Sequence, residues 1–97
     1  MFPKNKPHRS EDYKAFVRGL PCVVSGRTPC DPHHTERGIP KGPDTRCIPL
    51  HHPYHVELHA IGVASFERKY GLDLQRSVIE TLEKYIMAME VKWRPKR

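Results

Sequence analysis

The chain has 97 residues, a formal net charge of +6 and only 37% apolar residues, so one small domain with a marginal hydrophobic core is expected. Its three cysteines exclude a complete set of disulfides, and no apolar run is long enough to cross a membrane. No signal peptide is recognised, so a cytoplasmic protein with reduced thiols is expected. Basic residues gather near both ends, which suits either a polyanionic partner such as DNA or simple solubility.

In the N-terminal half, apolar residues at helical spacing follow Ser10, which is a good N-cap, and they predict a short helix that ends at Gly19. The β-prone run CVVS, residues 22–25, predicts a short strand. A turn-rich segment follows. His33 and His34 are then expected on a returning strand or at its end.

In the C-terminal half, residues 35–44 contain glycines and prolines without an apolar period and predict a loop. Residues 46–50 predict a second strand, and Pro53 suits the first turn of a helix that runs to about residue 60. Residues 63–70 predict another short helix, and a long helix is expected from about residue 73 to 93. We interpret the apolar stripe of that last helix as core, and its members are Leu74, Val78, Leu82, Ile86 and Met89.

Six of the seven histidines lie between positions 33 and 59. His55 and His59 are four residues apart on a predicted helix, so both imidazoles lie on one face within reach of a single metal ion. If the strand turns near this helix, His33 completes a site of three nitrogens with open positions. Since adjacent strand residues face opposite sides, His34 would then stay free to act as a general base.

This order of motifs resembles the HNH endonucleases of the ββα-metal, or His-Me finger, superfamily. It is most similar to small phage-type members related to the recombination-enhancement nucleases. The resemblance implies a small α+β fold, in which a two-stranded antiparallel hairpin and a helix form a core over about residues 20–62. Helices flank this core on both sides, and a basic tail covers residues 1–9 of a single HNH domain spanning 1–97. The motifs that carry the resemblance are PCVVSG (21–26), DPHH (31–34), a Gly/Pro/Lys-rich loop, CIPLHHPYHVELH (47–59) and FERKYG (66–71).

The resemblance implies metal-dependent hydrolysis of DNA phosphodiester bonds in the cytoplasm of a bacterial host, by a host- or phage-encoded enzyme. His34 would be the general base that activates water, and His33, His55 and His59 would bind one divalent ion, either Mg, Mn, Ni or Zn. Asp31 either orients a histidine through its second nitrogen or serves as a turn residue before Pro32. A targeting or recombination protein is a candidate partner, and the oligomeric state is open. The alternative function is a zinc-stabilised nucleic-acid-binding module without catalysis.

Related small HNH proteins often hold the hairpin with a structural zinc, but Ser25 and His51 stand where two of its cysteine ligands are expected. Cys30 could replace one of them. Cys47 and His52 compete for the fourth position, and alternation along the strand favours Cys47 because it shares a face with His51. The other interpretation is that the cysteines are small buried hydrophobic residues. The proposed zinc ligands are therefore Cys22, Cys30, Cys47 and His51, and the proposed phosphate contacts are Arg37, Lys41 and Arg46.

Overall fold

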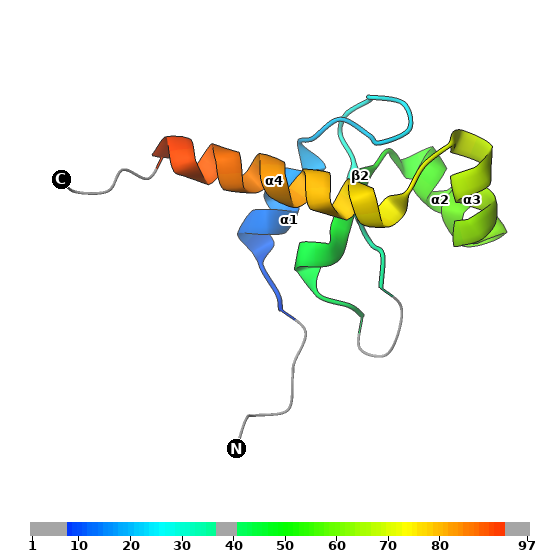
Figure 1. Ribbon diagram of the computed structural model, residues 1–97, viewed down its shortest axis with the longest axis horizontal. Helices are drawn as coiled ribbons and strands as arrows, with labels where there is room; N and C mark the ends of the chain where they lie inside the picture. The colour runs from blue at the N-terminus through cyan, green and yellow to red at the C-terminus, as the bar shows by residue number, and fades with distance from the viewer. Residues whose placement is uncertain (1–7, 37–40, 93–97) are drawn as a thin grey trace, which may run out of the picture.

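The computed structural model describes residues 8–36 and 41–92 and has a small α+β architecture (Figure 1). These residues form a two-stranded hairpin, one 3₁₀ turn and four α-helices, so the expected α+β class is confirmed. The elements in chain order are α1 (Glu11–Arg18), β1 (Asp31–His34), η1 (Asp44–Arg46), β2 (Cys47–Leu50), α2 (His52–Ile61), α3 (Val63–Tyr70) and α4 (Leu74–Lys92).

The hairpin is antiparallel, with Asp31 opposite Leu50 and His34 opposite Cys47. Helix α2 begins directly after β2, since Pro53 lies in the first turn, where its missing N–H leaves no hydrogen bond unmade. It ends at Gly62, whose φ of 85° is accessible to glycine without steric penalty. Helix α2 also contacts the first strand, β1.

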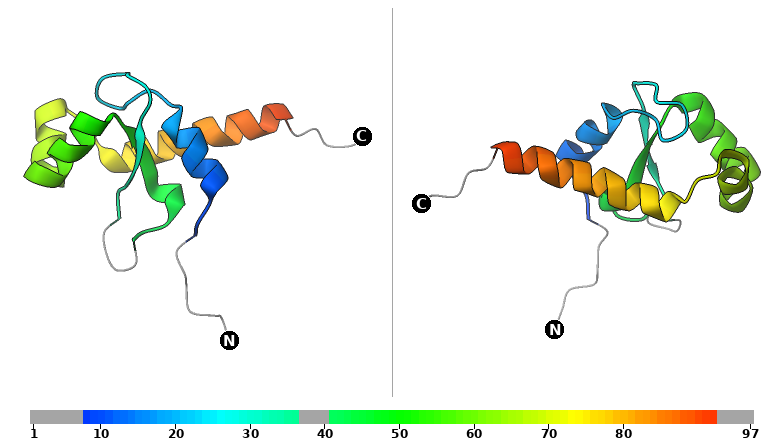
Figure 2. Two further views of the ribbon diagram at one scale, coloured as in Figure 1. Left: turned by 180° about the vertical axis from the view of Figure 1, so that it is seen from behind. Right: turned by 45° about the horizontal axis from the view of Figure 1, so that its top comes forward.

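The hydrophobic core lies between β2, α4 and the α2–α3 pair. Figure 2 shows α4 passing along the hairpin while α2 and α3 pair at one end of the molecule. Helix α1 is attached through Tyr13, which is buried and meets the ring of Tyr85 on α4 at a centroid distance of 4.9 Å. The central cluster consists of Cys22, Cys30, Ile48, Leu50, Leu58, Phe66, Leu74 and Val78.

The strand predicted at residues 22–25 is wrong, because this segment forms a turn. Cys22 donates its backbone N–H to the Arg27 carbonyl at 2.9 Å and accepts from the Gly26 N–H at 2.9 Å. These bonds occupy the backbone groups of Cys22 within the turn, and the single bond from the Val23 N–H to the Pro49 carbonyl, at 3.1 Å, does not make a strand. Gly26 adopts a φ of 74°, which closes the turn.

The core prediction for α4 is correct only for its first half. Leu74 and Val78 are buried and Leu82 is partly buried, but Ile86 is 54% exposed and Met89 43% exposed. A helix of 19 residues spans about 28 Å, whereas a strand of four residues spans about 13 Å, so the hairpin cannot cover all of it. None of the helices in the described segments is long and apolar enough to span a bilayer.

Candidate metal centre

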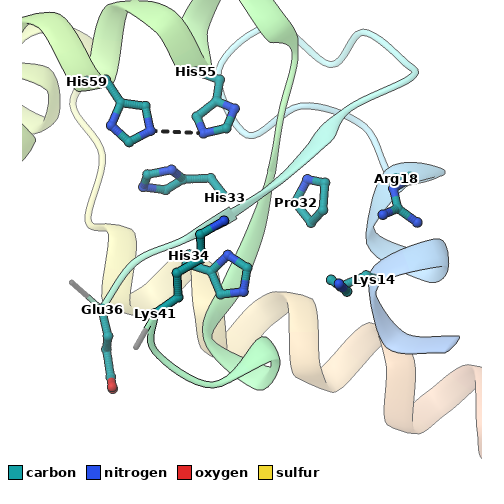
Figure 3. A pocket seen from close by; sticks show the side chains of 9 residues that line it. All are labelled: Lys14, Arg18, Pro32, His33, His34, Glu36, Lys41, His55 and His59. Carbon is teal, nitrogen blue, oxygen red and sulfur yellow. Dashed lines mark hydrogen bonds between the residues drawn. The ribbon is translucent and has the colours of Figure 1, made fainter. Parts of the chain in front are cut away.

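Three histidines from two elements converge beside the hairpin (Figure 3). His33 on β1 is buried, while His55 and His59 project from consecutive turns of α2. Their ring centroids lie 4.9 to 5.3 Å apart, and one ligand nitrogen from each ring lies within 4.8 Å of the other two. The structure therefore brings together the three residues expected to bind the catalytic metal. We call them the histidine group.

The spacing and chemistry of the histidine group suit a metal ion. Two nitrogens bound to one tetrahedral ion at 2.0–2.1 Å lie about 3.3 Å apart. His55 Nε2 and His59 Nε2 are separated by 3.2 Å, and without an ion they share a hydrogen bond at this distance. Three neutral imidazoles suit Zn, Ni or Mn, and they leave a coordination position open for water or substrate.

Asp31 orients one member of this group. Its Oδ2 atom accepts hydrogen bonds from His52 Nδ1 at 2.7 Å and from His55 Nδ1 at 3.0 Å. The hydrogen bond from His52 makes the largest contribution to lowering the pKa of the Asp31 carboxyl, and the bond from His55 makes the next largest. With its proton on Nδ1, neutral His55 presents a lone pair at Nε2, as a metal ligand must. This contact fits the orienting role considered for Asp31.

His34 lies next to His33 but belongs to a different set of contacts. Its Nε2 atom shares a hydrogen bond of 2.8 Å with Oδ1 of Asp44, which is only 1% exposed. Asp44 Oδ2 also accepts the backbone N–H of Ser10 at 2.8 Å, and Oδ1 accepts from Arg9 Nη1 at 3.1 Å. Burial raises the Asp44 pKa, but the hydrogen bonds from His34, Ser10 and Arg9 outweigh it and lower the pKa to about 2.

Sequence reasoning missed Asp44. An aspartate after Pro43 in a glycine-rich loop has the pattern of an ordinary turn residue. Its role depends on a partner ten positions away on the other strand, which no local pattern reveals. Asp44 is ionised at neutral pH, so it acts as a hydrogen-bond acceptor for the His34 ring.

Two further groups of candidate ligand atoms occur in the described part of the chain, each with its atoms within 4.8 Å of one another. One consists of Asp31, His52 and His55, and the other of His34, Asp44 and Cys47. Burial and the nearby Asp44 charge raise the pKa of Cys47 to about 12. The second group therefore offers a thiol at neutral pH, whereas metals bind the thiolate.

The histidine group and His34 line one open pocket of about 610 Å³. Cations from other parts of the chain line it too, so its charge is suited to an anionic ligand. The lining residues, shown in Figure 3, are Lys14, Arg18, Pro32, His33, His34, Glu36, Lys41, His55 and His59.

The expected phosphate contacts have different surroundings. Lys41 lines the pocket, whereas Arg46 forms an exposed ion pair with Glu36 at 3.1 Å. Arg37 lies outside the described residues. Lys14 and Arg18 were missed because helical periodicity identifies the buried face of α1 and says nothing of which polar residues face a ligand.

The four expected zinc ligands are not gathered at one point. Cys22 and Cys30 are both buried in the central core, and His51 Nδ1 lies 3.1 Å from the Pro29 carbonyl oxygen. Cys47 lies instead with His34 and Asp44, at the other end of β2 from His51. Within residues 8–36 and 41–92, no group of three or more close ligand atoms includes Cys22 or Cys30.

The environment of Cys22 nevertheless favours its thiolate more than that of the other cysteines. Burial raises its pKa, but backbone N–H groups of His51, Ser25 and Val24 direct hydrogen bonds to the sulfur, and the net shift is downward. In contrast, burial and the neighbouring Cys22 raise the pKa of Cys30 to about 11.

The fold and the site together define a small α+β protein with a three-histidine candidate metal centre in a basic pocket. A family model described as "Protein of unknown function (DUF968)" matches residues 1–89, so the chain belongs to this family. Comparison with curated proteins and with solved structures gives no match.

Proposed function

We propose that the protein is a metal-dependent endonuclease of the HNH type that hydrolyses DNA phosphodiester bonds. One observation carries the proposal: His34, held by the buried carboxylate of Asp44, lines the same pocket as the histidine group but is not part of it. A metal site that only stabilises a fold does not need an additional imidazole beside its ligands. In this proposal β1, β2 and α2 form a ββα-metal core.

His34 would act as the general base. Since its Nε2–H donates to ionised Asp44, the neutral ring presents a lone pair at Nδ1. This nitrogen takes a proton from water as the water oxygen forms a bond to phosphorus. The bond between phosphorus and the 3′ oxygen breaks, and the leaving oxygen takes a proton from solvent.

His33, His55 and His59 would hold the divalent ion. When bound, this ion supplies positive charge that stabilises the transition state and the leaving oxygen. Zn, Ni and Mn suit three imidazoles better than Mg does. In this proposal Asp31 keeps His55 in the tautomer that presents Nε2 to the ion, and His34 stays outside the ligand set.

The charge of the pocket supports DNA as the substrate. Lys14, Arg18 and Lys41 lie around its rim, and the whole chain carries a net charge of +6. Such a surface attracts a phosphate backbone without reading its bases. Specific targeting would then come from a partner, such as a recombination protein, in the cytoplasm of a bacterial host.

The proposal is tested by nicking of a supercoiled plasmid with Mn²⁺, Ni²⁺, Mg²⁺ or Zn²⁺, and with EDTA. His34→Ala is expected to lower the rate by about 10² to 10⁴ while metal content stays the same, because it removes the base and no ligand. The matched control is His8→Ala, which removes an exposed histidine outside the pocket. Equal rates for wild type and His34→Ala would contradict the proposed mechanism.

A second candidate function is a zinc-stabilised nucleic-acid-binding module without catalysis. It is favoured by the two buried cysteines Cys22 and Cys30 and by the N–H groups that surround the Cys22 sulfur. A structural zinc would take these two ligands and His51. This alternative predicts DNA binding and bound zinc, but no nicking with any of the four metals.

A further inference from the structure

Helix α1 forms a wall of the pocket beside β1 (Figure 3). Lys14 and Arg18 are four residues apart, so they project from the same side of this helix. The carbonyl of Arg18 accepts the backbone N–H of Cys30 at 3.0 Å, directly before β1 begins. The position of this end of α1 is therefore fixed relative to the strand that carries His33 and His34.

The two cations on this wall differ in their partners. Lys14 Nζ lies 2.8 Å from Glu11 Oε1 and 4.0 Å from Asp44 Oδ2, so nearby carboxylates already offset its charge. Among the residues that the structure describes, no carboxylate pairs with the exposed guanidinium of Arg18. Glu11 attracts Arg18 only at longer range than it attracts Lys14, so the guanidinium, which lines a pocket rich in imidazoles, is suited to an anion from outside the protein.

We propose that Arg18 binds a phosphate of the nucleic-acid backbone next to the phosphate that reacts at the histidine group. Its planar guanidinium can donate two parallel hydrogen bonds to one phosphate, which fixes both position and direction. The backbone would then run from α1 across His34 to α2. This inference rests on the proposed function for the identity of the ligand, and it moves the main phosphate contact from the loop expected to provide it to α1.

The test is binding of a short fluorescent DNA duplex to the whole chain, measured by anisotropy at several salt concentrations. No divalent cation is added, so that the probe stays intact. Arg18→Ala is expected to weaken binding about fivefold to tenfold and to reduce the slope of log K against log salt by about one. Arg18→Lys should recover part of the affinity, since it keeps the charge and loses the paired hydrogen bonds.

The matched control is Arg27→Ala, which removes the same charge from an exposed arginine that does not line the pocket. It is expected to bind within about twofold of wild type, because long-range attraction alone is weak at physiological salt. Equal losses in Arg18→Ala and Arg27→Ala, or an unchanged salt slope in Arg18→Ala, would overturn the inference.

Failure of this inference is distinguishable from failure of the endonuclease proposal. If binding depends on Arg18 and no metal supports nicking, the nuclease mechanism is wrong and the phosphate contact stands. If the wild type nicks DNA and Arg18→Ala binds and nicks as well as wild type, only the phosphate contact is wrong.

Discussion

The histidine group and the cysteines show two ways of placing ligands in a small fold. His55 and His59 are held by one helix, whose backbone fixes their separation, and His33 reaches them from the strand beside it. The three cysteines are distributed over a turn, the approach to β1 and the start of β2. The three histidines converge on one point, whereas no group of close ligand atoms in the described residues brings two of the cysteines together.

The two cases differ in the distance that the backbone sets between residues on the same face. A helical spacing of four residues places two side chains on one face in any context. The alternation that places Cys47 and His51 on one face of a strand leaves them four residues, about 13 Å, apart along it. Sharing a face is therefore sufficient for ligands on one helical turn and insufficient for ligands at opposite ends of a strand.

The largest expected effect comes from removing a histidine ligand. His59→Ala should weaken binding of Mn²⁺, Ni²⁺ or Zn²⁺ at the pocket by more than about 100-fold, because one of three protein ligands is lost. Cys30→Ser is the contrasting change and should leave affinity at this site unaltered. Isothermal titration calorimetry measures both, and equal losses in the two variants would place the metal elsewhere.

A smaller loss is expected from Asp31→Asn, which removes the acceptor that orients His55. Partners of this kind typically contribute about 10- to 100-fold to metal affinity. His52→Ala should have little effect, because the His52 side chain is 73% exposed and belongs to no ligand set in this proposal. If His52→Ala weakens binding and His59→Ala does not, the ion is held by Asp31, His52 and His55.

Asp44→Asn should destabilise the fold in a pH-dependent way. The pKa of Asp44 is about 2, below the 3.8 usual for an aspartate, so its ionised form stabilises the folded state above about pH 4. The difference in unfolding free energy from wild type should be about 2 kcal/mol at pH 7 and should shrink as the pH falls from 4 to 2. Urea denaturation at several pH values measures it. Asp12→Asn, on the exposed side of α1, serves as the control, and a loss that stays constant down to pH 2 would contradict the ion-pair explanation.

The smallest effect is expected for Cys47→Ala. Cys47 is fully buried, so the loss of its sulfur should cost about 1 kcal/mol of unfolding free energy. Zinc content, measured by atomic absorption, should equal that of wild type, because Cys47 lies apart from Cys22 and Cys30. A loss of one zinc per chain would show that Cys47 is a zinc ligand.

Local patterns in the sequence predict much of this fold. Ser10 as N-cap and the apolar spacing after it give α1, and Gly71 ends α3 in the left-handed conformation that favours glycine. The strand prediction for residues 22–25 fails because turn hydrogen bonds around Gly26 override β-propensity. In α4, periodicity correctly identified the apolar face but carried no information on how far the hairpin extends beneath it.

The sequence likewise predicts some residues of the candidate site and not others. The convergence of His33, His55 and His59 was predictable, since helical and strand periods alone place them once the hairpin meets α2. Asp44 and Arg18 were not, because only the tertiary structure brings Asp44 to His34 and places Arg18 in the wall of the pocket. The identity of the metal does not follow from either, since three imidazoles accept several ions.

The contacts of Asp44 also connect the proposed catalytic base to the start of the chain. His8 accepts the backbone N–H of Asp44 at 2.8 Å, and Arg9 and Ser10 donate to its carboxylate. A protein shortened to begin at Glu11 would keep every histidine of the pocket, yet it would leave this carboxylate with fewer donors and partly open to water. Measured activities should therefore depend on whether residues 8–10 are retained, even though none of these three residues lines the pocket.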